Sequence, residues 1–208
     1  MPRTQTERSA ATQQALLTAA RRLWGERGYA AVSTPEIAQA AGVTRGAMYH
    51  QYTEKTKLFL AVLEAVETDA VQRLTAVVLA ARPTTPAAAL HIAADAWLEI
   101  AGEPEVRQLV LLDAPGILGW AGFRDFSQRY GLGMTEQLLR AAIDSGELET
   151  QPIRPLATIL MGALDEAAMT IANARDPARE TAEVRTVIHN LIDGLLAPAA
   201  KQRRHVPS

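Results

Sequence analysis

The sequence has 208 residues and contains no cysteine. Disulfide bonds and thiolate metal sites are therefore excluded, as expected of a protein in a reducing cytoplasm. The chain also lacks an apolar run close to the roughly 20 residues that a membrane-spanning helix requires. The opening "MPRTQTERSA" has no hydrophobic core after its charges and does not resemble a secretory signal. We therefore expect a cytoplasmic protein without a membrane partner.

Motifs for metal binding or catalysis are scarce as well. None of the histidines is spaced as a metal ligand or lies in a recognisable Ser/His/Asp arrangement; they are His50, His91, His189 and His205. The segment "GLGMTE" (131–136) lacks a third glycine and a preceding strand, which argues against a dinucleotide-binding loop. We expect no metal site, no cofactor and no enzymatic activity; a small helical enzyme is kept as an alternative.

The composition is that of a folded, helical chain. Hydrophobic residues make up 48% and charged residues 21%, which is typical of globular proteins. A convincing period-two strand pattern is absent, and the apolar run "QLVLLDA" (108–114) fits a buried helix. We predict an all-α fold of about nine helices, divided by Gly, Pro and capping residues. They lie at about 7–27, between Ser33 and Gly42, and at about 45–52, 54–81, 87–102, 103–114, 123–145, 155–174 and 177–197.

The charges are distributed unevenly along the chain. Residues 1–57 carry eight Lys or Arg against four Asp or Glu, a net charge of +4, whereas residues 58–208 carry thirteen against nineteen, a net charge of −6. A basic first segment suggests that this segment alone contacts a polyanion such as DNA. Because chance can also produce a net charge of +4, the interpretation depends on where the side chains lie.

Two short helices joined by a tight turn follow the first long helix. Ser33 is a suitable N-cap, Pro35 lies in the first turn, and Glu36 completes a capping box. Gly42 ends this helix and Thr44 caps the next one. Helices joined at a single glycine cross at a large angle, which is the construction of a helix-turn-helix, whose second helix enters the major groove of DNA. The small or apolar positions that pack this angle are Ile37, Ala38, Ala41, Val43 and Met48.

The polar side chains of the second helix are suited to DNA. Thr44 and Arg45 lie at its N-terminus, where backbone N–H groups and the helix dipole attract phosphate, and Arg45 also fits a guanine edge. Gly46 and Ala47 leave the helix surface bare, which permits close approach to bases. For Tyr49 an ordinary packing role is the alternative. The predicted DNA-binding residues are Thr34, Thr44, Arg45, Gly46, Ala47, Tyr49, His50, Gln51 and Lys55.

Residues 13–64 resemble the N-terminal domain of the tetracycline-repressor-like (TetR) transcriptional regulators along its full length. The matching motifs are "ERGY" (26–29), "IAQAAGVTRGAMY" (37–49) and "EKTKLF" (54–59). The resemblance implies that 44–51 is the recognition helix and that Tyr49 and Lys55 contact phosphate. The chain departs from the family at Tyr52, where Phe is usual, and at Lys57, where an acid or Ala is common.

The resemblance also implies the organisation and activity of the whole chain. A helix-turn-helix DNA-binding domain over 1–57 precedes a helical ligand-binding and dimerisation domain over 58–208. The family forms homodimers that bind palindromic double-stranded DNA, and repression is its usual outcome. We therefore expect a sequence-specific repressor that is released from its operator by an unidentified small apolar or amphipathic effector. A DNA-binding regulator or architectural protein without small-molecule control is the alternative.

Two groups of residues in the second domain suggest sites. The last two helices carry broad apolar faces, which a four-helix bundle across a twofold axis would cover. The predicted dimer residues are Leu160, Leu164, Val184, Ile188, Leu191 and Leu195. Aromatic side chains with a few polar ones in the middle of the chain indicate an effector cavity. The candidates are Trp97, Leu112, Asp113, Trp120, Phe123, Phe126, Tyr130, Met134, Asp165 and Met169; for each of them core packing is the alternative.

Overall fold

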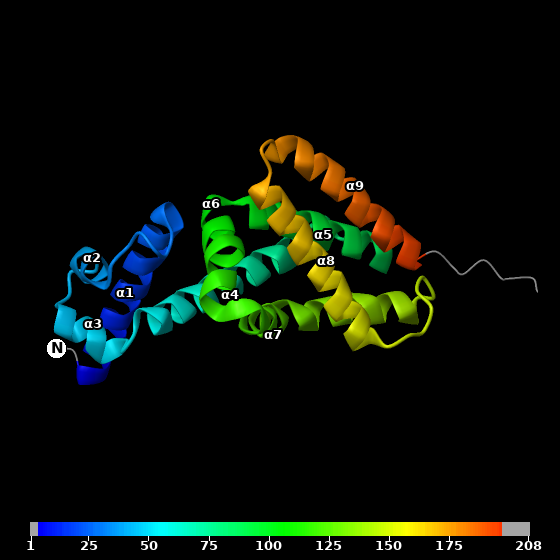
Figure 1. Ribbon diagram of the computed structural model, residues 1–208. Coiled ribbons are helices and arrows are strands. Elements are labelled where there is room, and N and C mark those ends of the chain that lie inside the picture. The colour runs from blue at the N-terminus through cyan, green and yellow to red at the C-terminus, as the bar shows by residue number, and fades with distance from the viewer. Residues whose placement is uncertain (1–3, 197–208) are drawn as a thin grey trace, which may run out of the picture. The chain divides into compact units, whose positions relative to one another are not determined.

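The structure is a computed structural model that describes residues 4–196 (Figure 1). No β-strand occurs among these residues, which confirms the all-α fold. The predicted end of the last helix at residue 197 lies outside the described residues. The elements in order are α1 (Gln5–Arg27), α2 (Thr34–Ala40), α3 (Arg45–Gln51), α4 (Lys55–Ala81), α5 (Pro86–Gly102), α6 (Pro104–Val106), a π-helix η1 (Arg107–Asp113), α7 (Ala114–Asp144), α8 (Ile153–Asn173) and α9 (Pro177–Leu196).

The chain forms two compact units that are not contiguous in sequence. Unit 1 consists of the residues up to Ala70 together with Ala101–Arg124, and unit 2 consists of Val71–Ile100 and the residues from Asp125 onward. Unit 1 therefore contains α1 to α3, the first part of α4, α6, η1 and the start of α7. The predicted domain boundary after residue 57 stays a prediction.

The first helix is defined by signals at both of its ends. Thr4 Oγ1 accepts a hydrogen bond from the Glu7 amide (3.2 Å), and Glu7 Oε2 accepts one from the Thr4 amide (2.8 Å), which completes a capping box. This cap explains why α1 begins before the predicted Glu7. The helix stops at Gly28, whose φ of 78° favours glycine.

Unit 1 is built on an aromatic core and an ionic contact. The rings of Trp24, Tyr29 and Phe59 lie 5.0 to 5.6 Å apart, and Trp24 and Phe59 are fully buried. Arg21 on α1 donates two hydrogen bonds of 2.8 Å to Glu105 on α6 and also pairs with Asp69 on α4. These contacts hold α6 and the first part of α4 against α1.

The region after residue 102 differs from the prediction. The expected α-helix over 103–114 is a short α6 followed by η1, and the expected start at Phe123 is wrong because α7 begins at Ala114. Pro115 does not break the chain of helices, since it follows the change from π to α hydrogen bonding, where backbone pairing is already irregular. The break occurs instead at Gly119, where a φ of 69° kinks α7.

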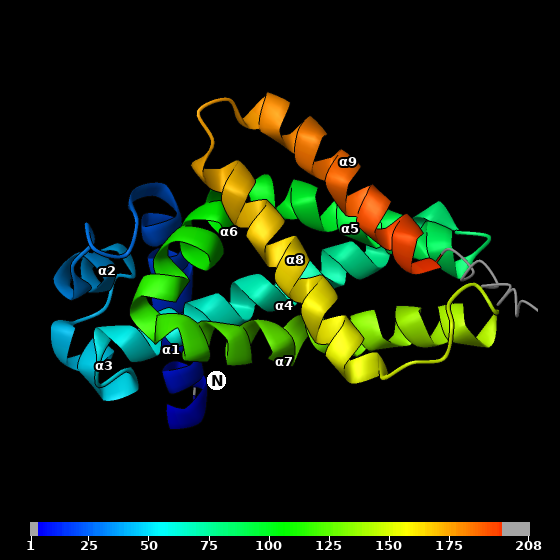
Figure 2. The ribbon, with the colours of Figure 1, turned by 45° about the vertical axis from the view of Figure 1, so that its right-hand side comes forward.

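In unit 2, α8 and α9 lie side by side and are joined by a short loop (Figure 2). An 18-residue window of α8 has a mean hydropathy of 1.3, so by length and composition alone this helix could cross a membrane. This corrects the expectation that no apolar run approaches that length. A core helix passes the same test, and several α8 side chains are buried in unit 2, so the hydropathy of α8 does not by itself indicate a membrane span.

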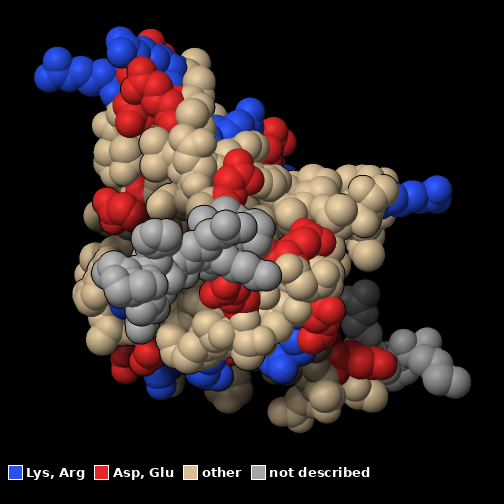
Figure 3. All heavy atoms as spheres, turned by 90° about the vertical axis from the view of Figure 1, so that its right-hand side faces the viewer, with Lys and Arg blue, Asp and Glu red and all other residues tan. Residues whose placement is uncertain are grey.

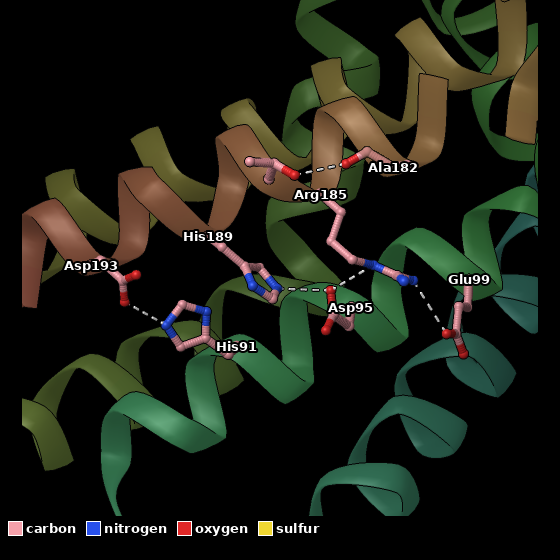
Figure 4. A network of polar contacts seen from close by, with 8 residues as sticks. His91, Asp95, Glu99, Ala182, Arg185, His189 and Asp193 are labelled. Atoms are coloured by element: carbon pink, nitrogen blue, oxygen red, sulfur yellow. Dashed lines mark hydrogen bonds and ion pairs between the residues drawn. The ribbon is translucent and has the colours of Figure 1, made fainter. Parts of the chain in front are cut away.

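Polar pairs at regular spacing hold α9 against α5 (Figure 4). Three α9 side chains four residues apart meet α5 side chains that are also four residues apart. His91 Nε2 lies 2.8 Å from an Asp193 carboxylate oxygen, His189 Nε2 lies 2.9 Å from one of Asp95, and Arg185 Nε lies 3.0 Å from the same Asp95 oxygen. Arg185 also reaches Glu99 at 3.4 Å. One row of polar α9 side chains is therefore turned toward α5 of the same chain.

Candidate functional site

The helix-turn-helix has the local geometry that its sequence predicts. Ser33 Oγ accepts from the Glu36 amide and Glu36 Oε2 accepts from the Ser33 amide, which caps α2. Thr44 Oγ1 accepts from the Ala47 amide at 3.1 Å and caps α3. Gly42 between them has a φ of 67°, and a Cβ there would touch nothing, so the backbone conformation alone requires glycine.

The buried side of this motif matches the expected packing. Ile37, Ala38 and Met48 are each at most 3% exposed, and Val43 is half-buried. Tyr52 is also buried, with 6% of its surface exposed, and desolvation raises the pKa of its hydroxyl. The hydroxyl that distinguishes Tyr52 from the usual Phe therefore lies in the core, where a phosphate cannot reach it.

The outer side of α2 and α3 gathers three of the predicted DNA-binding side chains. The Tyr49 hydroxyl lies 3.1 Å from Thr34 Oγ1, and the Arg45 guanidinium lies 5.6 Å from the centre of the Tyr49 ring. Hydrogen bonding to Thr34 and then to Arg45 lowers the pKa of Tyr49. Thr44, Gly46 and His50 are exposed beside them, and Ala47 is half-buried. This arrangement presents hydroxyl, guanidinium and imidazole groups on one surface, as contact with phosphates and base edges requires.

Glu36 remains ionised beside this surface. It accepts hydrogen bonds from the Ser33 amide and hydroxyl and pairs with Arg27 at 3.1 Å, and these contacts lower its pKa from 4.5 to about 2. The charge complements the N-terminal end of the α2 dipole. Glu36 thus stabilises the start of α2.

Two of the predicted DNA-binding side chains form hydrogen bonds within unit 1. Gln51 Nε2 donates to Ser9 Oγ on α1 at 2.8 Å, so its amide group is turned toward α1. Lys55 Nζ donates to the Tyr29 carbonyl at 2.6 Å and lies 4.0 Å from the centre of the Tyr29 ring. Desolvation lowers the pKa of Lys55, while the charges of Asp113 and Glu36 act in the opposite direction.

Sequence reasoning did not detect the central position of Tyr29. Its amide donates to Asp113 Oδ2 at 2.8 Å, its carbonyl accepts from Lys55, and its hydroxyl lies 3.3 Å from Thr56 Oγ1. The glycine before it, which ends α1, marks a turn in the sequence. A turn signal does not identify a partner 84 residues away, so only the tertiary structure shows the contact with Asp113.

The predicted effector residues are divided between the two units. Leu112, Asp113, Trp120 and Phe123 belong to unit 1, and Trp97, Phe126, Tyr130, Met134, Asp165 and Met169 belong to unit 2. Phe123 and Phe126 are buried, whereas Trp120 is 61% exposed. The rings of Phe126 and Tyr130 lie 4.9 Å apart. These residues remain candidates for an effector site.

The predicted dimer residues differ in exposure. Leu160 and Ile188 are 5% and 3% exposed and belong mainly to the core of unit 2, while Leu164, Val184 and Leu195 are half-buried and Leu191 is 49% exposed. Val187 and Ile159, which the prediction did not include, are 58% and 69% exposed. A groove of about 430 Å³ runs between α8 and α9 and is lined by Ala167, Val184, Val187, Ile188 and Leu191 among others.

A capped helix-turn-helix whose second helix carries exposed polar side chains defines a helix-turn-helix DNA-binding protein. Two family models match the chain: residues 16–62 match "Bacterial regulatory proteins, tetR family", and residues 87–195 match "Tetracyclin repressor-like, C-terminal domain". The chain belongs to the TetR family of transcriptional regulators.

Individual proteins support this assignment over nearly the whole chain. A TetR-family transcriptional regulator from Pectobacterium atrosepticum has a crystal structure with 33% identity and a TM-score of 0.82, covering 94% of this chain and 99% of that one. An HTH-type transcriptional repressor of Mycobacterium tuberculosis is 26% identical over 192 residues, 92% of this chain and 98% of the repressor. RolR in complex with resorcinol shares the fold, with a TM-score of 0.74, 16% identity and coverage of 94% of this chain and 92% of RolR.

Proposed function

We propose that this protein is a homodimeric repressor that binds a palindromic operator through α3 and is released by a small apolar or amphipathic effector. The observation that carries the DNA-binding part is the exposed group formed by Thr34, Arg45 and Tyr49 across α2 and α3. These side chains lie beside the capped N-terminus of α3, where helix dipole and backbone N–H groups favour phosphate.

The contacts with DNA divide into two kinds. Thr44, Tyr49 and His50 hydrogen-bond phosphates, and Lys55 adds a positive charge, so binding weakens as salt rises. Arg45 reads a base edge, and its bidentate donors suit guanine. In a twofold dimer the two α3 helices enter major grooves roughly 34–36 Å apart or a multiple of that spacing, which requires a palindromic site.

The face drawn in Figure 3 is less suited to this role. On the face shown in Figure 3, Asp and Glu side chains lie in small scattered groups, and the described residues form no continuous basic surface there. This distribution agrees with the net charge of −6 on residues 58–208. Among the surfaces described, the outer side of α2 and α3 therefore suits a polyanion best.

The dimer contact is proposed on α8 and α9. A row of polar α9 side chains is already paired with α5, and apolar side chains such as Val187 and Leu191 are exposed elsewhere on the helix. Exposed apolar faces that border a groove mark interaction sites. A second copy of the same two helices covers both faces at once, since a twofold contact is self-complementary.

Release by an effector requires the effector to bind one arrangement of the dimer better than the other, typically by 1–3 kcal/mol. The related fold of RolR holds the small phenol resorcinol, which supports a cavity for a compound of similar size. The aromatic and methionine side chains of unit 2, including Trp97, Tyr130 and Met134, are the candidates for its walls.

Selection of random duplexes with the full-length protein tests the proposal. We expect enrichment of an inverted repeat that binds more weakly at higher salt. Recovery without any sequence preference contradicts the proposal and favours an architectural DNA-binding role. Titration of the bound repeat with apolar and amphipathic compounds, phenols included, then tests release; a protein that keeps the repeat in all of them is a regulator without control by these compounds.

A further inference from the structure

We propose that Asp113 on η1 is a positioning residue for the phosphate contact of Lys55 and that it acts through Tyr29. The inference rests on the proposed function, because the phosphate contact of Lys55 is part of it. Asp113 does not contact DNA in this arrangement. It holds in place the turn after α1, where the Tyr29 carbonyl accepts a hydrogen bond from the Lys55 ammonium group.

The first step joins η1 to the turn after α1. Asp113 Oδ2 accepts the Tyr29 amide at 2.8 Å, and a carboxylate acceptor makes such a bond stronger than a neutral one. The turn also fits closely against η1. A Cβ on Gly28 would lie 3.0 Å from Gln108 Nε2 and 3.7 Å from Asp113 Oδ1. The position of η1 therefore determines the position of Tyr29.

The second step joins the turn to α4. The Tyr29 carbonyl accepts Lys55 Nζ at 2.6 Å, the ring lies 4.0 Å from the same atom, and the hydroxyl lies near Thr56. An ammonium group has three donors, so one bond to Tyr29 leaves two for a phosphate. A side chain that is already held in place loses less conformational freedom when it binds.

The same carboxylate offers a route for regulation. Asp113 can accept hydrogen bonds on both oxygens, but the Tyr29 amide occupies the one that points to the turn. A ligand donor or a change in η1 that draws the carboxylate away leaves Tyr29 without its partner. Lys55 then loses its orientation, and the affinity for DNA falls.

Lysine labelling of the full-length protein tests the hydrogen-bond chain without DNA. The sequence has three lysines, Lys55, Lys57 and Lys201, and exposed Lys57 serves as an internal reference. We expect Asp113→Ala to raise the rate at which an amine-reactive reagent modifies Lys55, relative to Lys57, several-fold above the wild-type ratio, because Nζ loses its hydrogen-bonded position. Asp113→Asn keeps a carbonyl acceptor for the Tyr29 amide and should keep the wild-type ratio. An unchanged ratio in Asp113→Ala, or the same rise in Asp113→Asn, overturns the proposal.

A double-mutant cycle on the selected operator tests the consequence for DNA. Asp113→Ala should weaken binding about 3- to 10-fold, as expected for one lost hydrogen bond, and lower the salt slope by about 1. In a Lys55→Ala background it should have no further effect. Asp125→Ala removes the same charge from an exposed position on α7 and is the control. If Asp113→Ala weakens binding equally with and without Lys55, its role is structural and the proposal is wrong.

Two further results separate this inference from the proposed function. If the wild-type protein selects no operator, both proposals fail. If it selects an operator and the Asp113 variants bind that operator as tightly as the wild type, only this inference is overturned. If Asp113→Ala does not fold, amide hydrogen exchange in the wild type replaces it. The Tyr29 amide should then exchange slowly, and exchange at the rate of an unstructured peptide overturns the proposal.

Discussion

At the scale of single residues, unit 1 gives the polar groups of the helix-turn-helix different surroundings. Arg45 lies over the Tyr49 ring with its guanidinium exposed, while Gln51 is turned toward Ser9. Both residues were predicted to contact DNA from their positions in the sequence. Their different surroundings make Arg45 the stronger candidate, because only its polar group is exposed without a hydrogen bond to α1.

Replacing Arg45 by Ala should weaken binding to the selected operator by about 1–3 kcal/mol and relax the base preference at one position of each half-site. Fluorescence anisotropy with the operator and single-base variants measures both effects. Arg22→Ala, which removes an exposed charge from α1, is the matched control. A uniform loss of affinity over all sequences would show that Arg45 contacts only phosphate.

Replacing Glu36 by Gln should change the dependence of stability on pH. The folded-state pKa of Glu36 is lowered from 4.5 to about 2, so its stabilising contribution is present above about 4.5 and is lost as pH falls toward 2. Thermal melting across this range should show the wild type approaching the variant as pH falls. Glu26→Gln on α1 is the control, and a constant difference in melting temperature over the range would contradict the assignment.

At the scale of elements, the turn that ends α1 and the kinked α7 show how glycine acts in this chain. Gly28 has a φ of 78° and close neighbours on η1, whereas Gly133 lies within α7 with open space where a Cβ would stand. Gly131 on the same helix packs against Met161, whose Cε would lie 2.7 Å from a Cβ. Each of these glycines therefore tolerates a Cβ to a different degree, which the sequence alone does not show.

Gly28→Ala should destabilise the protein by about 1–2 kcal/mol from the backbone conformation, with a further cost from the contact with Gln108. Gly133→Ala should instead stabilise it by about 0.5–1 kcal/mol, because alanine favours a helix over glycine. Urea denaturation of both variants measures the difference. Equal effects of the two substitutions would contradict this interpretation.

The elements were predicted well where local signals decide them. The predicted capping box at Ser33 and turn at Gly42 set α2 within a few residues of its observed bounds, whereas the capping box at Thr4, which was not predicted, starts α1 before the predicted Glu7. The predicted gap between the helices at about 103–114 and 123–145 was wrong, because a proline such as Pro115 usually ends a helix and a sequence pattern does not reveal the preceding π-helix.

At the scale of the whole molecule, the arrangement of α9 explains why a second copy is expected. Its polar side chains Arg185, His189 and Asp193 are paired with α5 (Figure 4), and apolar side chains of α9 line the groove beside α8. The exposed apolar side chains of α9, such as Val187 and Leu191, are expected to be covered by a second copy of the chain.

Charged substitutions on this face should therefore produce monomers. We expect Val187→Glu and Leu191→Glu to shift the protein from dimer to monomer in analytical ultracentrifugation, because each places a charge in a desolvated contact. Leu79→Glu, at a 71% exposed position on α4, is the control and should leave the dimer intact. A dimer that survives both α9 substitutions would place the contact elsewhere.

The sequence by itself determined the helical class, the helix-turn-helix and its exposed polar residues, because capping, turn and periodicity signals act over a few residues. The tertiary structure decided which of those residues are engaged within the fold. It buried Leu160 and Ile188 in unit 2, paired a row of polar α9 side chains with α5, and joined Asp113 to Tyr29 across 84 positions. Such contacts depend on how helices that are distant in sequence pack together, and a local sequence pattern does not determine that packing.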